Sequence, residues 1–273
     1  MTAASAAERA FDRLAPSYDA LAAGDLFRRQ RARTHGVFAR RIGAGFRVLE
    51  LGCGTGLDTE FLGRLGAHVL ACDASAAMTA ITERRVAEAG LTRTARVLHC
   101  GVESIGAYLD VLAEARFDAI VSNFGALNCV ASLNPLGELA GTWLRPGGTL
   151  LLGLLGRTCA WEHAYFLLAR RRTLDRRRHA SPVSVPVAGV DVPTYYHTVA
   201  DVRAAMGREM TLRSTTGIGV LTPPMYLEAR WSALPPGLRA AVDLADRVVC
   251  RVPPFNRLGD HILLAFRRRG THV

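Results

Sequence analysis

The stretch VLELGCGTGLDT, residues 48–59, indicates most directly which fold this chain adopts. An apolar segment runs directly into three glycines at alternate positions, and a polar run that can start a helix follows. A strand that turns through glycines into a helix brings backbone N–H groups close to a bound nucleotide. The stretch therefore predicts a turn for a nucleotide-like ligand, and the neighbouring residues decide which ligand fits it.

Apolar runs alternate with helical patterns between residues 48 and 155, which is typical of a parallel sheet covered by helices. The predicted strands are residues 48–51, 68–72, 95–100, 117–122 and 149–155. The predicted helices are residues 58–65, 104–115 and 133–143, together with a helix that Ser75 caps and Gly90 ends. The run LRPGG, residues 144–148, is predicted to turn the last helix into the strand that follows it.

The regular alternation ends after residue 157. The proline-containing run SPVSVPVAGVDVPTYYHT, residues 181–198, predicts short strands or a hairpin laid over the sheet rather than core strands. A capped helix is predicted after Thr198, and further strands are predicted at residues 210–220 and 261–267. A proline-bounded apolar insertion, residues 223–254, separates these two strands.

The composition is that of a globular protein. With 273 residues, of which 49% are hydrophobic, the chain can bury a core of one large domain. Its most apolar run, residues 149–156, is much shorter than the roughly 20 residues of a membrane span, and residues 1–10 contain no long apolar segment. The six cysteines are scattered without a C-x-x-C pair, so we expect neither zinc nor a disulfide, and a cytoplasmic location.

The formal net charge is +10, and all 34 basic residues are arginines. Basic patches attract phosphates, so nucleic acid or an anionic surface is one interpretation. The densest group is Arg170, Arg171, Arg172, Arg176, Arg177 and Arg178. A charge run of this kind favours a solvated helix face, and anionic substrates, lipid headgroups or RNA remain the alternatives.

The glycine turn does not fit a dinucleotide. Its pattern is G-x-G-x-G, and Leu57 stands where the dinucleotide pattern places its last glycine. Glu50 lies two residues before the first glycine, where a carboxylate suits an amine better than a pyrophosphate. Asp73, at the end of the second predicted strand, can accept both hydroxyls of a ribose. A P-loop is excluded because it requires a lysine.

In this combination the sequence resembles the class I S-adenosylmethionine-dependent methyltransferases, and specifically the small-molecule branch similar to the ubiquinone and menaquinone C-methylases. Four segments carry the resemblance in the family's order: ELGCGTG (50–56), DASAAM (73–78), FDAIVSNFGALN (117–128) and LRPGGTLLL (144–152). It covers residues 11–155 well and the remainder loosely.

The resemblance implies an α/β fold in a single domain. The expected architecture is a Rossmann-like, seven-stranded, mostly parallel sheet with helices on both faces, an N-terminal lid helix and a cap inserted before the last strand. Lid helices are expected in residues 1–42, the cofactor-binding core in 43–157, and the remaining strands with substrate-cap insertions in 158–273.

The resemblance also implies S-adenosylmethionine as cofactor, with S-adenosylhomocysteine as product. The residues expected to bind it are Tyr18, Glu50, Gly52, Cys53, Gly54, Asp73, Ala74, Met78, Val102, Glu103, Asn123 and Phe124. Asp73 would bind the ribose and Met78 would pack near the adenine. The family often has an acidic residue directly after strand three. Here the first carboxylate is Glu103, so the adenine amine would meet Glu103 or a backbone carbonyl.

The run FDRLAPSYD, residues 11–19, resembles the N-terminal helix that closes over the cofactor in this branch. An aromatic ring at Tyr18 can stabilise a cationic sulfur, and a lid excludes water. The alternative is that Phe11, Leu14 and Tyr18, at helical spacing, only dock an amphipathic helix on the core.

Methyl transfer from a sulfonium is an in-line displacement, so the protein contributes mainly alignment. A base is needed only if the acceptor must lose a proton. The candidate bases are His163, Tyr195, Tyr196, His197 and His261. If TYYHT is a strand, Tyr195 and His197 face one side, which makes His197 the first candidate and His163 the second. Catalysis is thus assigned to His197, Tyr195, His163 and Tyr18, and substrate binding to Asn128, Tyr196, Met225 and Tyr226.

The acceptor is predicted by elimination. The run Asn123-Phe124-Gly125-Ala126 is not the N-P-P-aromatic run of nucleobase-amine methylases, Cys129 does not follow a proline, and a loop with two glutamates is missing. A small organic acceptor remains. The apolar 223–254 insertion suggests a hydrophobic metabolite, such as a polyketide, quinone, isoprenoid or fatty acyl compound of secondary metabolism, unless it only packs on strand edges.

Two other functions remain open. The chain can use S-adenosylmethionine without methylating, for cyclisation or aminocarboxypropyl transfer, or it can be a non-catalytic partner subunit that binds RNA or protein. We expect a monomer or homodimer that needs no metal and does not bind nucleic acid, and peripheral membrane contact remains open.

Overall fold

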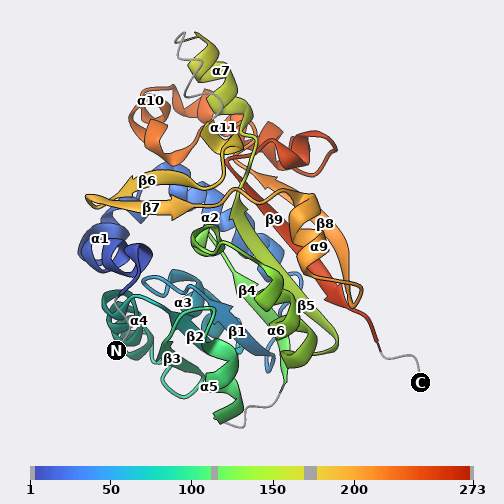
Figure 1. Cartoon of the computed structure of the whole chain (residues 1–273). Coiled ribbons are helices and arrows are strands. Elements are labelled where there is room, and N and C mark those ends of the chain that lie inside the picture. Colours follow the sequence, from blue (N-terminus) through green and yellow to red (C-terminus); the bar gives the residue numbers. More distant parts are fainter. Residues whose placement is uncertain (1–3, 112–115, 169–176, 271–273) are drawn as a thin grey trace.

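The computed structural model describes residues 4–111, 116–168 and 177–270 (Figure 1). Its centre is a seven-stranded sheet with the order β3-β2-β1-β4-β5-β9-β8, and a separate two-stranded hairpin pairs β6 with β7. The strands are β1 (Arg47–Leu51), β2 (His68–Asp73), β3 (Ala95–His99), β4 (Phe117–Ser122), β5 (Leu144–Leu155), β6 (Val183–Val187), β7 (Val190–Thr194), β8 (Met210–Ile218) and β9 (His261–Arg268).

Strands β3, β2, β1, β4 and β5 are parallel neighbours, and β9 runs antiparallel to both β5 and β8. The central strands are apolar along almost their whole length because parallel strands are covered on both faces. The predicted seven-stranded, mostly parallel α/β sheet is confirmed.

Helices cover both faces of the sheet (Figure 1). One buried apolar cluster joins the sheet to α5, α6 and α9, and the other joins it to α2, α3 and α4. The helices are α1 (Ala6–Ala22), α2 (Asp25–Phe38), α3 (Leu57–Arg64), α4 (Ala76–Glu88), α5 (Ile105–Val111), α6 (Asn134–Trp143), α7 (Ala160–Leu168), α9 (Val199–Ala205), α10 (Glu228–Ser232) and α11 (Pro236–Val249), with single 3₁₀ turns η1 (Ala126–Cys129), η2 (Arg177–His179), η3 (Met225–Leu227) and η4 (Phe255–Arg257).

The strand order places a switch point at β1. From β1 the chain first moves outward through β2 to β3, and it then returns to β4 on the other side of β1. The loops that follow β1 and β4 therefore diverge at the carboxyl ends of these strands, where open parallel sheets bind their ligands. This edge of the sheet is where the sequence motifs come together.

Three sequence predictions need correction. The run LRPGG is not a turn before a strand, because β5 already begins at Leu144 and LRPGG forms an irregularity inside it. The run TYYHT is not part of a strand beyond its first residue, because β7 ends at Thr194. The solvated face predicted for the arginine cluster is wrong for Arg178, which is buried, and residues 170–176 lie outside the described residues. The predicted helix 104–115 is described only as far as Val111.

Helix α1 lies across the carboxyl edge of the sheet (Figure 1) and contributes residues to the cavity there. It begins at a capping box, in which Ser5 and Glu8 each bind the other's backbone N–H. Asp12 accepts hydrogen bonds from the Ser75 hydroxyl and from the Ala77 N–H at the start of α4. The helix is therefore fastened to the same loop in which β2 ends.

The insertion between β8 and β9 packs against α2. Glu228 accepts hydrogen bonds from the backbone N–H groups of Asp25 and Leu26, and so caps the first turn of α2 from a distant part of the chain. The buried Trp231 donates its indole N–H to Asp25. The insertion is thus anchored to α2, which covers one face of the sheet.

Candidate cofactor and substrate site

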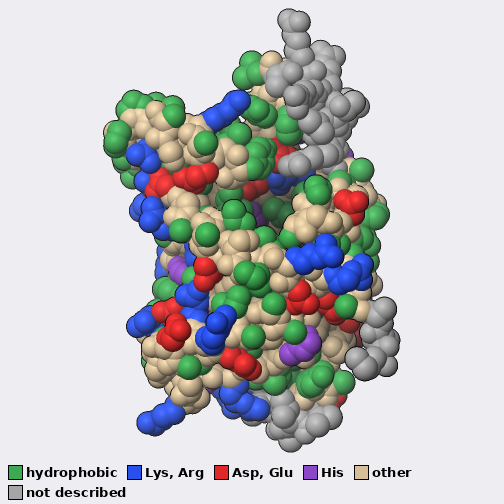
Figure 2. Space-filling view, turned by 90° about the vertical axis from the view of Figure 1, so that its left-hand side faces the viewer, with side chains coloured by type: hydrophobic (Ala, Val, Ile, Leu, Met, Phe, Trp, Pro, Cys, Tyr) green, Lys and Arg blue, Asp and Glu red, His purple; other side chains and the backbone are tan. Residues whose placement is uncertain are grey.

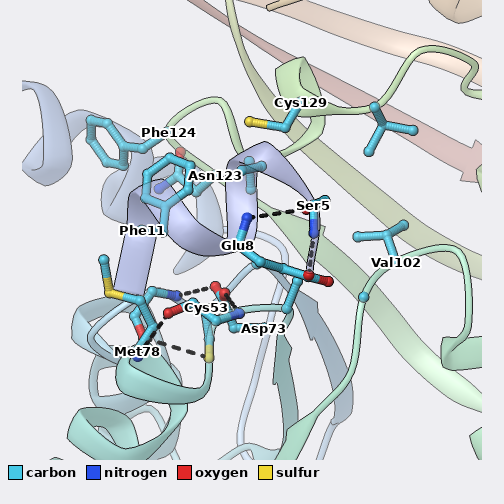
Figure 3. Close-up of a pocket in the computed structure, with 18 of the residues that line it drawn as sticks. Ser5, Glu8, Phe11, Cys53, Asp73, Met78, Val102, Asn123, Phe124 and Cys129 are labelled. Atoms are coloured by element: carbon cyan, nitrogen blue, oxygen red, sulfur yellow. Dashed lines mark hydrogen bonds between the residues drawn. The ribbon is translucent and has the colours of Figure 1, made fainter. Parts of the chain in front are cut away.

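A cavity of about 420 Å³ lies at the carboxyl ends of β1 to β4, between the sheet and α1 (Figure 3). Figure 3 shows Asp73 and Met78 on one side of the cavity and Cys129 on the opposite side, with the Ser5–Phe11 segment across it. Its lining is Ser5, Ala6, Ala7, Glu8, Phe11, Tyr18, Arg31, Gly52, Cys53, Gly54, Thr55, Leu57, Asp58, Asp73, Ala74, Ser75, Met78, Gly101, Val102, Glu103, Asn123, Phe124, Ala126, Cys129, Val130, Ala131, Pro193 and Tyr195.

The glycine turn after β1 forms the floor of the cavity. Gly52, Gly54 and Gly56 all have positive φ angles, of 72°, 56° and 81°. A Cβ atom on Gly52 would lie 2.3 Å from the Cβ of Ala126, so a side chain there would push away the loop after β4. The turn therefore needs glycine both for its backbone conformation and for its close approach to η1.

Asp73, the last residue of β2, holds the glycine turn in place through a hydrogen bond. Its carboxylate accepts hydrogen bonds from the Gly54 N–H at 2.9 Å and from the Ser75 N–H at 2.9 Å. Burial raises the pKa of Asp73, and the two N–H groups only partly oppose that rise. Because a carboxylate has about four acceptor positions, two bonds leave capacity for hydroxyl donors of a ligand.

The loops after β2 and β3 form one end of the cavity. Ala74 and Met78 line it from the start of α4, and Val102 and Glu103 line it from the loop that follows β3. Met78 is buried and Glu103 is exposed. An apolar slot with a carboxylate at its rim suits a flat aromatic ring that carries an amine.

Beside α2, the wall of the cavity contains a buried charge network. The Arg31 guanidinium forms an ion pair with Asp58, and the Asn123 amide donates to Asp58 at 2.8 Å. His35 Nε2 lies 2.6 Å from the same carboxylate. Burial alone would raise the pKa of Asp58, but Arg31, His35 and Asn123 hold it below its ordinary range. Asp58 is therefore an anion inside the protein.

Three aromatic rings surround this network. The Arg31 guanidinium carbon lies 4.4 Å from the ring centroid of Phe124 and 4.8 Å from that of Phe27, and these two rings are stacked at 4.8 Å. The Tyr18 ring meets the edge of Phe27 at 6.1 Å. Phe124 has a φ of 48°, in the left-handed region, and it lines the cavity. Arg31 is thus held in one orientation at the cavity wall.

Most of the predicted cofactor-binding residues meet in this cavity. Eleven of the twelve line it, namely Tyr18, Gly52, Cys53, Gly54, Asp73, Ala74, Met78, Val102, Glu103, Asn123 and Phe124. Glu50 is buried beneath the lining, where its carboxylate accepts a hydrogen bond from the Thr59 hydroxyl at 2.6 Å.

The predicted catalytic residues are divided between the cavity and its surroundings. Tyr18 and Tyr195 line the cavity. The His197 ring stacks on Tyr195 with 6.4 Å between ring centroids, and its Nε2 lies 3.1 Å from the Val130 carbonyl, so it lies one layer behind the lining. His163 stacks on His179 at 5.9 Å and lies outside the lining.

The predicted substrate-binding residues lie outside the lining. The buried Asn128 uses its amide in bonds to the Tyr195 carbonyl and the Leu155 N–H, which fix the hairpin exit against β5. Tyr196 is buried under the Arg178 guanidinium, 5.4 Å from its ring centroid. Met225 and Tyr226 form η3, and the Tyr226 hydroxyl donates to Glu162. His261, the fifth candidate base, lies behind the Phe124 ring at 5.4 Å.

Sequence reasoning missed Arg31, Asp58 and Cys129, which all line the cavity. Asp58 follows the glycine turn directly, so its position next to the ligand was available from the motif. Arg31 is one of 34 arginines, and nothing in its neighbourhood in the sequence distinguishes it. Its role depends on α2 lying beside β4, which is a contact between distant segments.

Glu50 provides a prediction for the pH dependence of stability. Burial, and next the charge of Asp58, raise the pKa of Glu50 to about 8 from an ordinary value of 4.5. The folded state therefore binds this proton more tightly than the unfolded state does, and the free energy of unfolding falls as the pH rises from about 5 to about 8. Glu50→Gln is expected to remove this fall, and to gain a few kcal/mol at about pH 8. Denaturant titrations at both pH values measure it.

The matched control is Glu88→Gln, which changes an exposed glutamate at the end of α4. It is expected to keep the pH dependence of the wild-type protein. The assignment to Glu50 would be contradicted if the free energy of unfolding fell equally between the two pH values in Glu50→Gln and in the wild-type protein.

The described residues contain neither a candidate metal site nor a helix that could cross a membrane. In that part of the chain, His, Cys, Asp and Glu side chains do not form a group of three or more that could hold a metal ion. Nor does any helix there have the length and apolar character needed to cross a membrane.

Comparison with known proteins agrees with the motifs. Residues 48–148 match the family model described as a methyltransferase domain. The ubiquinone biosynthesis O-methyltransferase of Methylocella silvestris is 31% identical over 170 residues, which cover 59% of this chain and 63% of that protein. The protein of the same name from Xylella fastidiosa is 35% identical over 119 residues, which cover 43% of this chain and 45% of that protein. The chain thus spans less than two thirds of either relative.

Solved structures share the fold over most of the chain. The cyclase SpnF has a TM-score of 0.62 at 17% identity, covering 97% of this chain and 96% of that one. Geranyl diphosphate C-methyltransferase from Streptomyces coelicolor has a TM-score of 0.54 at 17% identity, covering 87% of this chain and 79% of that one. At such identity these structures show the fold alone. The family match and the curated relatives identify residues 48–148 as a class I S-adenosylmethionine-dependent methyltransferase domain similar to that of the ubiquinone methylases.

Proposed function

We propose that this chain transfers the methyl group of S-adenosylmethionine to a small, hydrophobic organic acceptor. One observation carries the proposal. The same cavity is lined by the glycine turn and Asp73 on one side and by an apolar wall beneath the β6–β7 hairpin on the other. The family match of residues 48–148 and the names of the relatives support the same activity.

The strand order suggests how the cofactor lies. Its adenine would rest between Met78 and Val102, with its amine near Glu103, and its ribose would bind Asp73. Its methionine part would then run over the glycine turn toward Arg31. This direction follows the sheet from β3 and β2 across β1 to β4.

The charges of the cavity support a cationic cofactor. Its lining contains the carboxylates of Glu8, Asp58, Asp73 and Glu103, and one guanidinium, that of Arg31. S-adenosylmethionine carries a sulfonium and an ammonium group against one carboxylate. Because the site is partly buried, these opposite charges attract more strongly than they would in bulk water.

The acceptor end is apolar. Its lining includes Val130, Ala131, Pro193 and the ring of Tyr195. Among the described residues this wall contains no cationic side chain, so an acceptor with a diphosphate would have no cationic partner in it. A neutral, hydrophobic acceptor fits best.

The thiol in this wall is poorly suited to covalent catalysis. Burial raises the pKa of Cys129 to about 11, so the thiol keeps its proton at neutral pH. Only the thiolate is a strong nucleophile. The proposed reaction is therefore direct transfer, in which the acceptor atom attacks the methyl carbon opposite the sulfur while the carbon–sulfur bond breaks.

The protein's contribution to this step is alignment and exclusion of water. Tyr195 would contact the acceptor, and His197 would hold Tyr195 in place through ring stacking and its bond to the Val130 carbonyl. If the acceptor loses a proton on methylation, the Tyr195 phenol is the group in this wall that can relay it, by taking it up as its own proton leaves.

Arg31 gives a test of the cofactor's direction. Its Nε atom is buried and has no hydrogen-bond partner among the described residues, which suits a carboxylate ligand. Arg31→Met is expected to weaken binding of S-adenosylhomocysteine at least about tenfold, since a charge-assisted bond is lost. Binding of methylthioadenosine, which lacks the carboxylate, should change less than about twofold. Calorimetry with both ligands measures this. Equal losses for the two ligands would contradict the direction.

The activity itself is tested with methyl-labelled S-adenosylmethionine and a cell extract fractionated into lipid, aqueous, nucleic-acid and protein pools. Label is expected in an extractable small molecule, with stoichiometric S-adenosylhomocysteine. Methylthioadenosine as the product would indicate aminocarboxypropyl transfer, and unchanged cofactor with an altered substrate would indicate cyclisation. Label in nucleic acid or protein would also contradict the proposal. The Asp73→Ala protein serves as the inactive control.

A further inference from the structure

Helix α11 presents its apolar side to solvent and its acidic side to the protein. Asp243 and Asp246 are buried, whereas Leu244 and Val248 are 66% and 65% exposed. A surface helix ordinarily does the reverse, because burying its apolar stripe is what holds it to the core. Interactions other than burial of this apolar side must therefore hold α11 in its orientation.

The cause is an ion-pair network with α2. Arg33 pairs with both aspartates, and it also donates to the Asp243 carbonyl at 3.0 Å. Asp246 accepts the backbone N–H groups of Val220 and Leu221 at 3.0 and 2.6 Å. Burial alone would raise the pKa of Asp243, but hydrogen bonds from Arg33 and Arg247 outweigh this effect and hold the pKa below its ordinary value. The carboxylate therefore stays ionised. Turning α11 to bury its leucines would break all these bonds.

The exposed apolar residues form a continuous stripe. Leu238, Ala241, Leu244 and Val248 follow one another at intervals of three or four residues, so they share one face of the helix. The stripe is extended before the helix by Leu234, at 36% exposed, and after it by Val252 and Phe255, at 45% and 46%. Hydrophobic side chains also gather on the upper end of the molecule in Figure 2, which α7, α10 and α11 form in Figure 1.

Arginines line one side of this stripe. A groove of about 370 Å³ between α11 and α2 is lined by Arg28, Arg29, Arg33, Arg40, Arg247 and Arg251, with Asp243 as its acidic residue. Within the described part of the chain, Arg40 and Arg251 form no ion pair, and both are exposed. An apolar stripe thus lies directly beside a cationic groove.

We propose that this face rests on an anionic lipid surface, with the apolar stripe of α11 in the boundary between headgroups and acyl chains and the arginines of the groove on lipid phosphates. An amphipathic helix with basic residues beside its apolar face is the arrangement that binds in this way. Charge complementarity selects this occupant over a second copy of the chain. A twofold pairing through the same face would bring two sets of arginines together.

Flotation of the protein with lipid vesicles tests the proposal, and it does not depend on methyl transfer. Binding is expected to vesicles of phosphatidylcholine with phosphatidylglycerol, to be weak on phosphatidylcholine alone, and to fall as salt is added. The double variant Leu244→Glu with Val248→Glu is expected to lower the affinity at least about tenfold, since two apolar contacts become two anions. Arg251→Glu should lower it on anionic vesicles only.

The matched control is Tyr108→Glu, which changes an exposed apolar residue on α5 and should leave vesicle binding unchanged. Unchanged S-adenosylhomocysteine affinity in each variant shows that the fold is intact. The proposal is overturned if wild-type protein does not float with anionic vesicles, or if the double variant floats equally well. It is also overturned if the double variant instead abolishes a dimer seen by analytical ultracentrifugation, because the stripe would then be a contact between copies.

Discussion

Asp73→Ala is expected to weaken binding of S-adenosylmethionine at least about tenfold. If the carboxylate accepts two ribose hydroxyls, their loss removes charged hydrogen bonds of roughly 1.5 to 3 kcal/mol each. The substitution also releases the N–H groups of Gly54 and Ser75, which Asp73 holds in the loops on either side of the ribose position. The expected loss of affinity therefore has two causes: the missing hydrogen bonds to the ribose, and the reduced order of the two loops that Asp73 holds.

Calorimetry with S-adenosylhomocysteine measures this loss without interference from turnover. The control is Asp110→Ala, which removes an exposed carboxylate on α5 and should leave the affinity unchanged. Because burial raises the pKa of Asp73, affinity in the wild-type protein is also expected to fall with decreasing pH as this carboxyl takes up its proton. If Asp73→Ala binds as tightly as wild type, the ribose assignment fails.

Arg178→Met is expected to lower the free energy of unfolding by about 3 to 5 kcal/mol. The guanidinium donates two hydrogen bonds to Glu162, one to Asp260 and one to each of the carbonyls of Gly156 and Asp260, so all five N–H donors are used. Methionine has a similar volume, but it would leave two buried carboxylates without their cation. Urea denaturation measures the loss.

Two further variants sharpen this test. Arg178→Lys should recover little, because an ammonium group cannot reproduce the planar arrangement of five donors. Arg64→Met removes an exposed pair with Glu60 and should cost less than about 1 kcal/mol. A loss below about 1 kcal/mol in Arg178→Met would contradict the structural role assigned to the network.

The part of the fold that sequence could predict is the part held together by local patterns. Strands β1 to β4 and the helices between them follow from apolar periodicity and from caps such as Ser75, and most of the cofactor-binding residues lie at the ends of these strands. Because parallel strands end at one edge, motifs far apart in sequence were expected to meet there. Eleven of the twelve cofactor-binding residues line one cavity for this reason.

The rest of the fold and of the site depends on ion pairs between distant segments, which no local sequence pattern reveals. Arg178 belongs to a run that is typical of a solvated face, yet Glu162 and Asp260 bury it. The 223–254 insertion is apolar enough to suggest a cap over the substrate, but it contributes no residue to the described lining of the cavity. The ion pairs of Arg33 with Asp243 and Asp246 hold the acidic side of α11 against the protein instead. The acceptor end is formed instead by the hairpin and η1, through Pro193, Tyr195 and Val130.

The position of α1 has a consequence for detecting ligands. Ser5, Ala6, Ala7, Glu8, Phe11 and Tyr18 belong to the lining although they precede residue 48, where the family match begins. A ligand that contacts this wall stabilises the docked helix over states in which it is detached, by mass action. Hydrogen exchange of the α1 amides should therefore slow on binding, so that occupancy of the methyltransferase domain can be followed from a helix outside it.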